Sequence, residues 1–500
     1  MNHWMTSKGR RSFGVIGGFG PLGSADVASK LALASSGGGE REPVEIAYDP
    51  RPFGGAALLA PDGECMTERK LYLIDAILDF ARRGIDTVIL PCFFSHTFID
   101  ELQANSPLVI VDMIDAVRSH VLRTLGRAAS GRAASGRARR IGVLATAATR
   151  EARLFERYFA SPGFEVLHPR RDDGDRVTEA VYGEHGIRSG QLFGLPIALL
   201  DEACADLVAQ GAEVIVPGAT EIALIANRLA PLAAPILDTN SIYARHALHW
   251  EGGPSRRPFK VGVVGGVGPA ATVDFMQKIV ASTPAARDQD HIKLIVEQNP
   301  QIPDRTGYLV GDGPDPTLSL YATCKKLEAG HADIIAIPCN TAHAYVDRIQ
   351  PRLSVPIVNM LTETVAYLRE RFPRLREVGV LATTGTVASG VYRRALAAQG
   401  LYEVVPGAEL QARVMNAIYG EKGVKAGFTS GQCVADIRAA AAELAERGVQ
   451  AIILGCTELP LLLPEPEFES LDGARAALVD PTAILAKRCV ARALEGAAHP

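Results

Sequence analysis

The stretch Phe13-Gly-Val-Ile-Gly-Gly-Phe-Gly-Pro21 recurs in the second half of the chain as Val261-Gly-Val-Val-Gly-Gly-Val-Gly-Pro269. In both places a short apolar run leads into a glycine-rich turn and a proline, which is typical of a strand followed directly by a helix. A second motif recurs in the same order, as Ile141-Gly-Val-Leu-Ala-Thr146 and Val378-Gly-Val-Leu-Ala-Thr383. These repeats predict a tandem duplication.

Each copy is predicted to be an α/β domain of two lobes. The chain has 500 residues, whereas a single hydrophobic core stops growing at roughly 250 to 300 residues. Short β-branched runs at 260–264, 292–296 and 333–337 alternate with helix-period segments, which indicates βαβ units and parallel sheets. Because the strand-and-turn motif occurs twice in each copy, we expect two lobes around an interlobe cleft. Glycine and proline at the junction give predicted domains 1–254 and 258–500.

The composition excludes several classes of function. With 47% hydrophobic and 22% charged residues, the chain is typical of a soluble globular protein. The net charge of −4 provides no positive field to attract nucleic acid or an anionic membrane. No apolar run approaches the roughly 18 residues of a membrane-spanning helix, and the N-terminus has no apolar leader. We therefore expect a cytoplasmic protein that acts on a small molecule.

Two of the eight cysteines stand out. No pair has the C-x-x-C spacing of a zinc or redox site, so neither a metal nor a disulfide framework is expected. Cys339 follows an apolar strand and precedes Asn340 and Thr341, and Cys456 follows another strand and precedes Thr457. Open α/β sheets bind ligands at the carboxyl ends of their strands. If the two lobes face each other, both thiols point into one cleft.

The second copy resembles the aspartate/glutamate racemase family, the cofactor-independent amino-acid racemases that use two cysteines. The blocks that carry the resemblance occur in family order: Gly265-Gly-Val-Gly-Pro269, Asn299-Pro-Gln-Ile-Pro-Asp-Arg-Thr306, Pro338-Cys-Asn-Thr341, Leu381-Ala-Thr-Thr-Gly-Thr386, Lys425-Ala-Gly427 and Gly455-Cys-Thr-Glu458. The resemblance implies that Cys339 and Cys456 are catalytic and that neither pyridoxal phosphate nor any other cofactor takes part. It assigns substrate binding to six polar side chains: Arg305, Asn340, Thr341, Thr384, Lys425 and Thr457.

Racemisation explains why two thiols are needed. A thiolate removes the α-proton from one face of the substrate, and a thiol returns a proton to the opposite face. Nearby cations and helix N-termini favour the thiolate form of a cysteine. Two cations, Arg305 and Lys425, suit a substrate with two carboxylates. The expected substrate is therefore aspartate or glutamate.

The first copy lacks much of this set. Cys92 remains, but Ala219 stands where the second copy has Cys456, and Tyr48-Asp-Pro-Arg-Pro-Phe53 replaces the loop that contains Arg305. Arg188 is a possible replacement for Lys425. The first copy is thus predicted to be a degenerate domain that either mimics a family homodimer within one chain or has changed chemistry. Further association between chains is left open.

Three other functions fit parts of the pattern. A maleate-type cis–trans isomerase would use one of the paired thiols to add to a double bond. A single-cysteine decarboxylase of related fold would suit the first copy, and an amino-acid-binding sensor would suit a degenerate domain. The intact pair of Cys339 and Cys456 disfavours a non-catalytic protein, and Glu458 with the loop at 303–306 favours the racemases over the isomerases.

Overall fold

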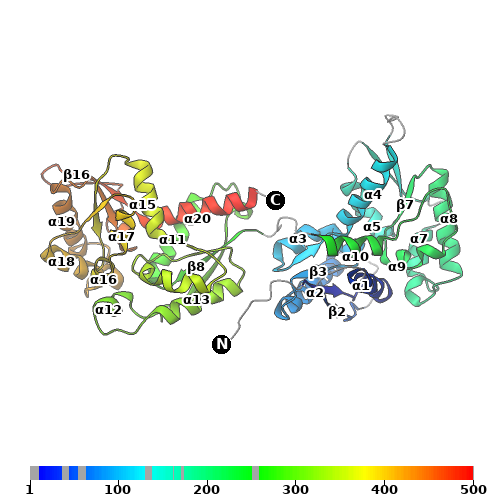
Figure 1. Ribbon diagram of the computed structural model, residues 1–500, viewed down its shortest axis with the longest axis horizontal. Coiled ribbons are helices and arrows are strands. Elements are labelled where there is room, and N and C mark those ends of the chain that lie inside the picture. Colours follow the sequence, from blue (N-terminus) through cyan, green and yellow to red (C-terminus); the bar gives the residue numbers. More distant parts are fainter. Residues whose placement is uncertain are drawn as a thin grey trace. The chain divides into compact units, whose positions relative to one another are not determined.

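The computed structural model describes residues 11–36, 44–54, 63–129, 138–160, 163–170, 174–250, 258–464 and 466–498. The chain divides into two compact units, Met1–Arg257 and Pro258–Pro500 (Figure 1). Residues 251–257 of the predicted junction lie outside the described residues. Each unit consists of two sheets covered by helices.

The first unit has one four-stranded and one three-stranded sheet, both parallel. Their strand orders are β2-β1-β3-β4 and β6-β5-β7. The strands are β1 (Ser12–Ile16), β2 (Glu45–Asp49), β3 (Thr87–Ile89), β4 (Val109–Val111), β5 (Arg139–Leu144), β6 (Phe164–Leu167) and β7 (Val214–Pro217). The helices are α1 (Pro21–Ser36), α2 (Gly63–Arg82), α3 (Ile99–Asn105), α4 (Met113–Ala129), α5 (Ala147–Glu151), α6 (Leu154–Tyr158), α7 (Arg176–Tyr182), α8 (Leu195–Ala209), α9 (Thr220–Ile225) and α10 (Thr239–His249).

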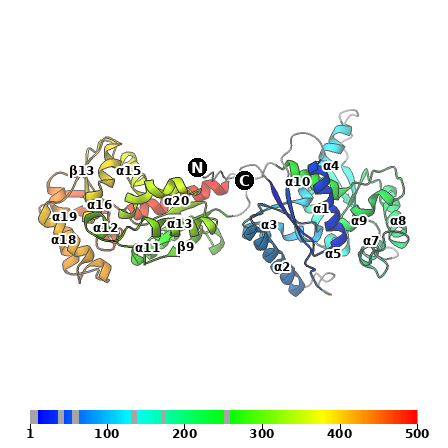
Figure 2. The same cartoon turned by 60° about the horizontal axis from the view of Figure 1, so that its bottom comes forward.

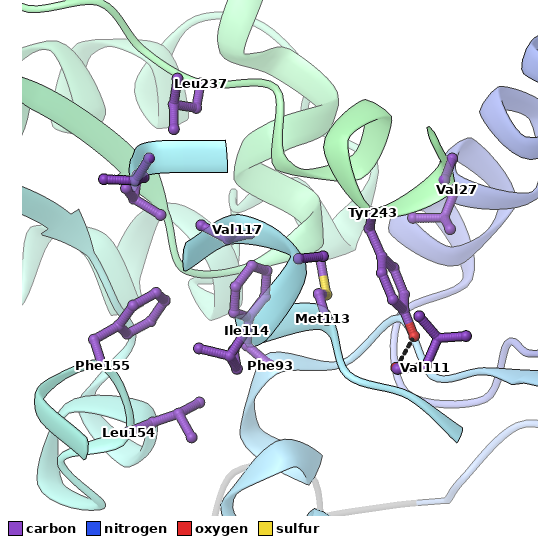
Figure 3. Close-up of a cluster of buried hydrophobic side chains, with 14 of the residues drawn as sticks. Val27, Phe93, Val111, Met113, Ile114, Val117, Leu154, Phe155, Leu237 and Tyr243 are labelled. Atoms are coloured by element: carbon purple, nitrogen blue, oxygen red, sulfur yellow. Dashed lines mark hydrogen bonds between the residues drawn. The ribbon is translucent and has the colours of Figure 1, made fainter. Parts of the chain in front are cut away.

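The last helix of the first unit, α10, returns from the second lobe to pack on the first, against α1 and α4 (Figure 2). Its Tyr243 is fully buried in the core beside Met113 of α4 (Figure 3). The Tyr243 hydroxyl donates a hydrogen bond to the Val111 carbonyl at 2.7 Å and accepts one from the Leu90 amide at 3.0 Å. The buried polar atom is therefore satisfied, and it ties α10 to the ends of two strands.

The second unit repeats this plan. Its first sheet has the order β11-β10-β8-β9, the same arrangement as in the first unit, and its second has the order β13-β12-β14-β16-β15. The strands are β8 (Lys260–Gly265), β9 (Lys293–Gln298), β10 (Ile334–Ala336), β11 (Ile357–Val358), β12 (Glu377–Leu381), β13 (Tyr402–Val404), β14 (Ala451–Leu454), β15 (Glu467–Glu469) and β16 (Arg475–Val479). The helices are α11 (Pro269–Ser282), α12 (Arg305–Val310), α13 (Thr317–Ala329), α14 (Val346–Ile349), α15 (Met360–Arg371), α16 (Thr384–Ser389), α17 (Val391–Ala397), α18 (Ala408–Tyr419), α19 (Gln432–Glu446) and α20 (Pro481–Ala498).

The predicted fold class is confirmed: two tandem α/β copies, each with two lobes built on parallel strands. One strand departs from the prediction, because β15 pairs antiparallel with β16 at the edge of the last sheet. The final helix, α20, packs against α11 and α15 just as α10 packs against α1 and α4. Among the described residues, no helix is both long and apolar enough to cross a membrane.

Candidate active site

Cys339 lies directly beyond the carboxyl end of β10, in a tight turn. It is buried, and its amide donates a hydrogen bond to the Ile337 carbonyl at 2.7 Å. Nδ1 of His343 lies 2.9 Å from the Cys339 carbonyl, while Nε2 accepts the Met360 amide at 3.1 Å. Nδ1 must therefore carry the proton. Burial lowers the pKa of His343 to about 4, so this neutral ring positions the cysteine loop and is not a proton carrier.

Arg305 is the cation beside Cys339. It begins α12, and the side chain of Asp304 caps that helix by accepting the Gly307 amide. Burial acts to lower the pKa of the guanidinium, but Cys339, Asp304 and Tyr419 together outweigh it and the pKa of Arg305 is raised. Nη1 donates to the Ile302 and Pro303 carbonyls at 3.2 and 3.1 Å. Nε has no hydrogen-bond partner among the described residues, which leaves one buried donor available to a ligand.

Cys456 lies beyond the carboxyl end of β14 in a network with a buried carboxylate. Its thiol donates to Oε2 of Glu458 at 3.1 Å, and Nζ of Lys425 donates to Oε1 at 2.5 Å. Burial raises the pKa of Cys456 well above its ordinary value, and the Glu458 charge raises it further. Burial acts to raise the pKa of Glu458 too, but Lys425 prevails and lowers it. The arrangement therefore holds a protonated thiol beside an ionised carboxylate.

The glycine-rich loop at 265–269 reaches from the first lobe onto this network. A Cβ atom on Gly268 would lie 2.3 Å from Oε1 of Glu458 and 3.3 Å from Nζ of Lys425. Only glycine allows this close approach. The negative group that this loop approaches is the protein's own Glu458 carboxylate.

Three of the other predicted binding residues already have partners within the protein. Thr341 shares hydrogen bonds with Thr386 at 2.7 Å and Thr383 at 3.3 Å, which joins the two lobes. Thr457 donates to Glu458 at 3.2 Å. The hydroxyl of Thr384 is a weaker partner, because it accepts from Nε2 of Gln411 at 3.4 Å.

Asn340 differs from these threonines. Its Oδ1 accepts the Tyr392 hydroxyl at 2.6 Å, while its buried Nδ2 has no partner among the described residues. Asn340 therefore offers an unused donor, as Arg305 does. Tyr392 itself was not predicted, because it lies on α17 in a segment without any polar motif.

Tyr419 connects the surroundings of the two cysteines and was also not predicted. Its hydroxyl donates to Oδ1 of Asp304, the residue before Arg305, at 3.0 Å. Its ring lies 5.5 Å from Nζ of Lys425. Burial raises the pKa of Tyr419; Lys425 acts to lower it, and Asp304 and Cys456 act to raise it. Tyr419 thus contacts both the residue that precedes Arg305 and the lysine near Cys456.

The first unit retains part of this arrangement around Cys92. Arg188 lies 3.5 Å from the Glu221 carboxylate, as Lys425 lies beside Glu458. Cys92 accepts hydrogen bonds from Ser95 at 3.2 Å and from the buried Arg69 of α2 at 3.7 Å, a cation that the sequence motifs did not reveal.

Ala219 and Cys92 line the cleft of the first unit, which has a volume of about 30 Å³. This is room for one or two water molecules. Across the described ranges of the whole chain, no group of three or more His, Cys, Asp and Glu side chains is placed to hold a metal ion.

Comparison with known proteins places these features in a family. The model of the Asp/Glu/hydantoin racemases matches residues 16–247 and 264–489. The broad specificity amino-acid racemase RacX of Bacillus subtilis is 31% identical over 146 residues, which is 28% of this chain and 61% of that protein. A glutamate racemase of Corynebacterium kroppenstedtii is 33% identical over 174 residues, which is 32% of this chain and 58% of that protein.

The chain thus spans about three fifths of the length of these curated relatives. The solved aspartate racemase of Picrophilus torridus is 28% identical, with 47% of this chain and 94% of that chain covered and a TM-score of 0.41. The resemblance predicted from the motif blocks is confirmed by the family match in both units. The chain belongs to the Asp/Glu/hydantoin racemase family and carries the family domain twice.

Proposed function

We propose that the chain is a cofactor-independent amino-acid racemase whose second unit acts on aspartate or glutamate. The observation that carries the proposal is the pair of buried thiols, Cys339 and Cys456, at the carboxyl ends of two strands in facing lobes. Each thiol has its own cation close by, Arg305 in one case and Lys425 with Glu458 in the other. Proton transfer on both faces of an α-carbon requires such a pair of acid–base groups.

The two thiols are proposed to serve as acid and base in turn. Cys456 is held as a thiol by burial and by Glu458, so it is the proton donor for one hand of substrate. Cys339 is the base in that direction, and Arg305 accompanies negative charge on its sulfur. The roles exchange for the other hand. Lys425 then compensates the charge on Cys456, because its ammonium interacts with both that sulfur and the Glu458 carboxylate.

The donors around the thiols favour a dicarboxylic substrate. Nε of Arg305 and Nδ2 of Asn340 are buried and unpartnered among the described residues, so a substrate carboxylate satisfies both. Lys425 is suited to the second carboxylate, although it then shares its charge with Glu458. Thr341, Thr384 and Thr457 complete the proposed binding set.

The first unit is proposed to have no racemase activity. Ala219 supplies no acid or base opposite Cys92, and a cleft of about 30 Å³ is smaller than an amino acid. This unit is proposed to act as a structural mate within the chain.

Solvent-deuterium exchange at the α-carbon tests the proposal. The protein is incubated in D2O, without added cofactor, with a panel of L- and D-amino acids, and exchange is expected for one acidic amino acid of both hands. Cys339→Ser and Cys456→Ser should each abolish interconversion of the two hands, because a serine hydroxyl is a far weaker acid than a thiol. Cys433→Ser is the matched control, since its thiol donates to the Phe428 and Ser430 carbonyls among the described residues. Isomerisation of a cis-alkene dicarboxylate without any α-exchange would replace the racemase with the isomerase alternative.

A further inference from the structure

A basic cavity of about 650 Å³ lies along α4 and α10 of the first unit, apart from the cleft that contains Cys92. Five of its lining residues are histidines or arginines: His120, Arg123, Arg245, His246 and His249. The acidic residue in the lining is Asp238, which is already engaged. It accepts from Lys30 at 2.9 Å and from the Ser241 hydroxyl at 2.7 Å.

The permanent positive charges of this cavity are the two arginines of its lining, Arg123 and Arg245. Within the described part of the chain, neither Arg123 nor Arg245 forms an ion pair. Burial lowers the pKa of His120, and both arginines lower it further. Burial also lowers the pKa of His246, as do Arg123 and His249, while Asp115 and Asp112 on the α4 side act to raise it. The arginines thus disfavour protonated histidines beside them, and an anion in the cavity would relieve this repulsion.

In the second unit, the basic residues at the equivalent position are neutralised by acidic side chains. Met113 and Met360 each donate a backbone hydrogen bond to the equivalent histidine, which aligns α4 with α15. Lys30, with Asp26 and Asp238, recurs as Lys278 with Asp274 and Asp480, which aligns α10 with α20.

In the second unit, α15 supplies acids to the bases of α20. Arg488 pairs with Glu363 at 3.2 Å and with Glu370 at 2.9 Å, and Arg492 pairs with Glu363 at 2.7 Å. Arg123 follows Met113 by the same number of residues as Glu370 follows Met360. Arg123 of α4 is therefore the counterpart of Glu370 of α15. The first unit has therefore kept the basic face of its last helix and exchanged an acidic partner for another base.

We propose that this cavity of the first unit binds a small anion of the phosphate class, with at least two negative charges, between α4 and α10. Arginine presents a planar fork of donors that matches phosphate oxygens, and two arginines in one cavity suit an anion with more than one negative charge. A volume of about 650 Å³ admits a small molecule with room beyond one phosphate group. Free pyrophosphate and a phosphate ester share this chemistry.

Calorimetric titration of the full chain tests the proposal. Inorganic pyrophosphate and ribose 5-phosphate serve as separate probes, so that the two arms distinguish a free inorganic anion from a phosphate ester. We expect saturable binding of at least one probe. Arg123→Glu, which restores the acid found in the second unit, should weaken it by roughly tenfold or more, because a charge-assisted contact is lost and a repulsive charge is introduced. Arg123→Ala should give a smaller loss of the same sign.

Arg118→Glu is the matched control. This arginine is on the same helix but does not line the cavity, so its reversal changes the net charge equally. Equal weakening by Arg118→Glu and Arg123→Glu would show binding to the general field of the molecule and overturn the proposal. If neither probe bound at millimolar concentration, the proposal would also be overturned. Charge-dependent self-association without anion binding would show that a protein surface fills the cavity, which also contradicts a small-anion site.

Discussion

Lys425 and Glu458 form a largely buried ion pair on which the state of Cys456 depends. The Lys425 side chain is 22% exposed and that of Glu458 is 3% exposed. Lys425→Met leaves Glu458 without its counter-ion, so we expect racemisation to be lost and the free energy of unfolding at pH 7 to fall by at most about 3 kcal/mol. Chemical unfolding measures the change.

The pH dependence of that change follows from the lowered pKa of Glu458. Its pKa in the folded protein lies below the ordinary value of 4.5, so the stabilisation is present above pH 4.5 and disappears as the pH falls through the folded-state pKa. The stability gap between wild type and Lys425→Met should therefore narrow in acid, where both proteins have a protonated Glu458. Lys425→Met combined with Glu458→Gln should regain stability without regaining activity. A gap that is independent of pH would contradict the assigned pair.

Arg305 is expected to contribute to binding more than to folding. Arg305→Ala removes a charge-assisted contact to one substrate carboxylate, which typically costs about 1.5 to 3 kcal/mol, or roughly ten- to a hundredfold in kcat/KM for a dicarboxylic amino acid. Arg305→Lys keeps the charge and should lose less. Arg287→Ala, at an arginine that is 74% exposed, is the control. Equal loss on every amino acid, together with a lower melting temperature, would instead indicate a structural role.

At the scale of elements, the loop at 265–269 is predicted to be intolerant of any side chain at Gly268. In Gly268→Ala the new Cβ would meet Oε1 of Glu458 at 2.3 Å, so the carboxylate must move away from Lys425 and Cys456. We expect a large fall in kcat and a lower melting temperature, because the buried carboxylate is separated from its counter-ion. Gly20→Ala creates the same 2.3 Å contact with Glu221 in the first unit and should leave racemisation intact. If Gly20→Ala proved the more damaging variant, the second unit would not be the catalytic one.

The sequence predicted the elements better than it predicted the contacts between them. Repeated strand-and-turn motifs mark local structure, and they located β8, β12 and both cysteine loops. Tyr419, Tyr392 and Arg69 were missed because each acts through a neighbour that is distant in the chain. Arg69, for example, reaches Cys92 from the first half of α2. The antiparallel pairing of β15 was missed because a three-residue strand carries no periodicity of its own.

At the scale of the whole molecule, one fold occurs twice with different chemistry around a common framework. Both units keep the neutral histidine beneath the first cysteine, since His96 repeats the two hydrogen bonds of His343. Both also keep the glutamate with its cation, as Glu221 with Arg188 and Glu458 with Lys425. These shared groups therefore maintain the shape of the cleft. The second thiol, Cys456 in place of Ala219, distinguishes the proposed catalytic unit from its mate.

This division of labour predicts opposite outcomes for two equivalent substitutions. Cys92 and Cys339 occupy the same strand end, but Ala219 stands opposite Cys92, and one thiol cannot serve both faces of an α-carbon. We expect Cys92→Ala to leave racemisation of the acidic amino acid nearly unchanged and Cys339→Ala to abolish it, with both activities measured in the full chain on the same substrate. Greater damage from Cys92→Ala would transfer the chemistry to the first unit, where Arg69, Ser95 and Tyr182 around Cys92 would have to supply the missing acid or base.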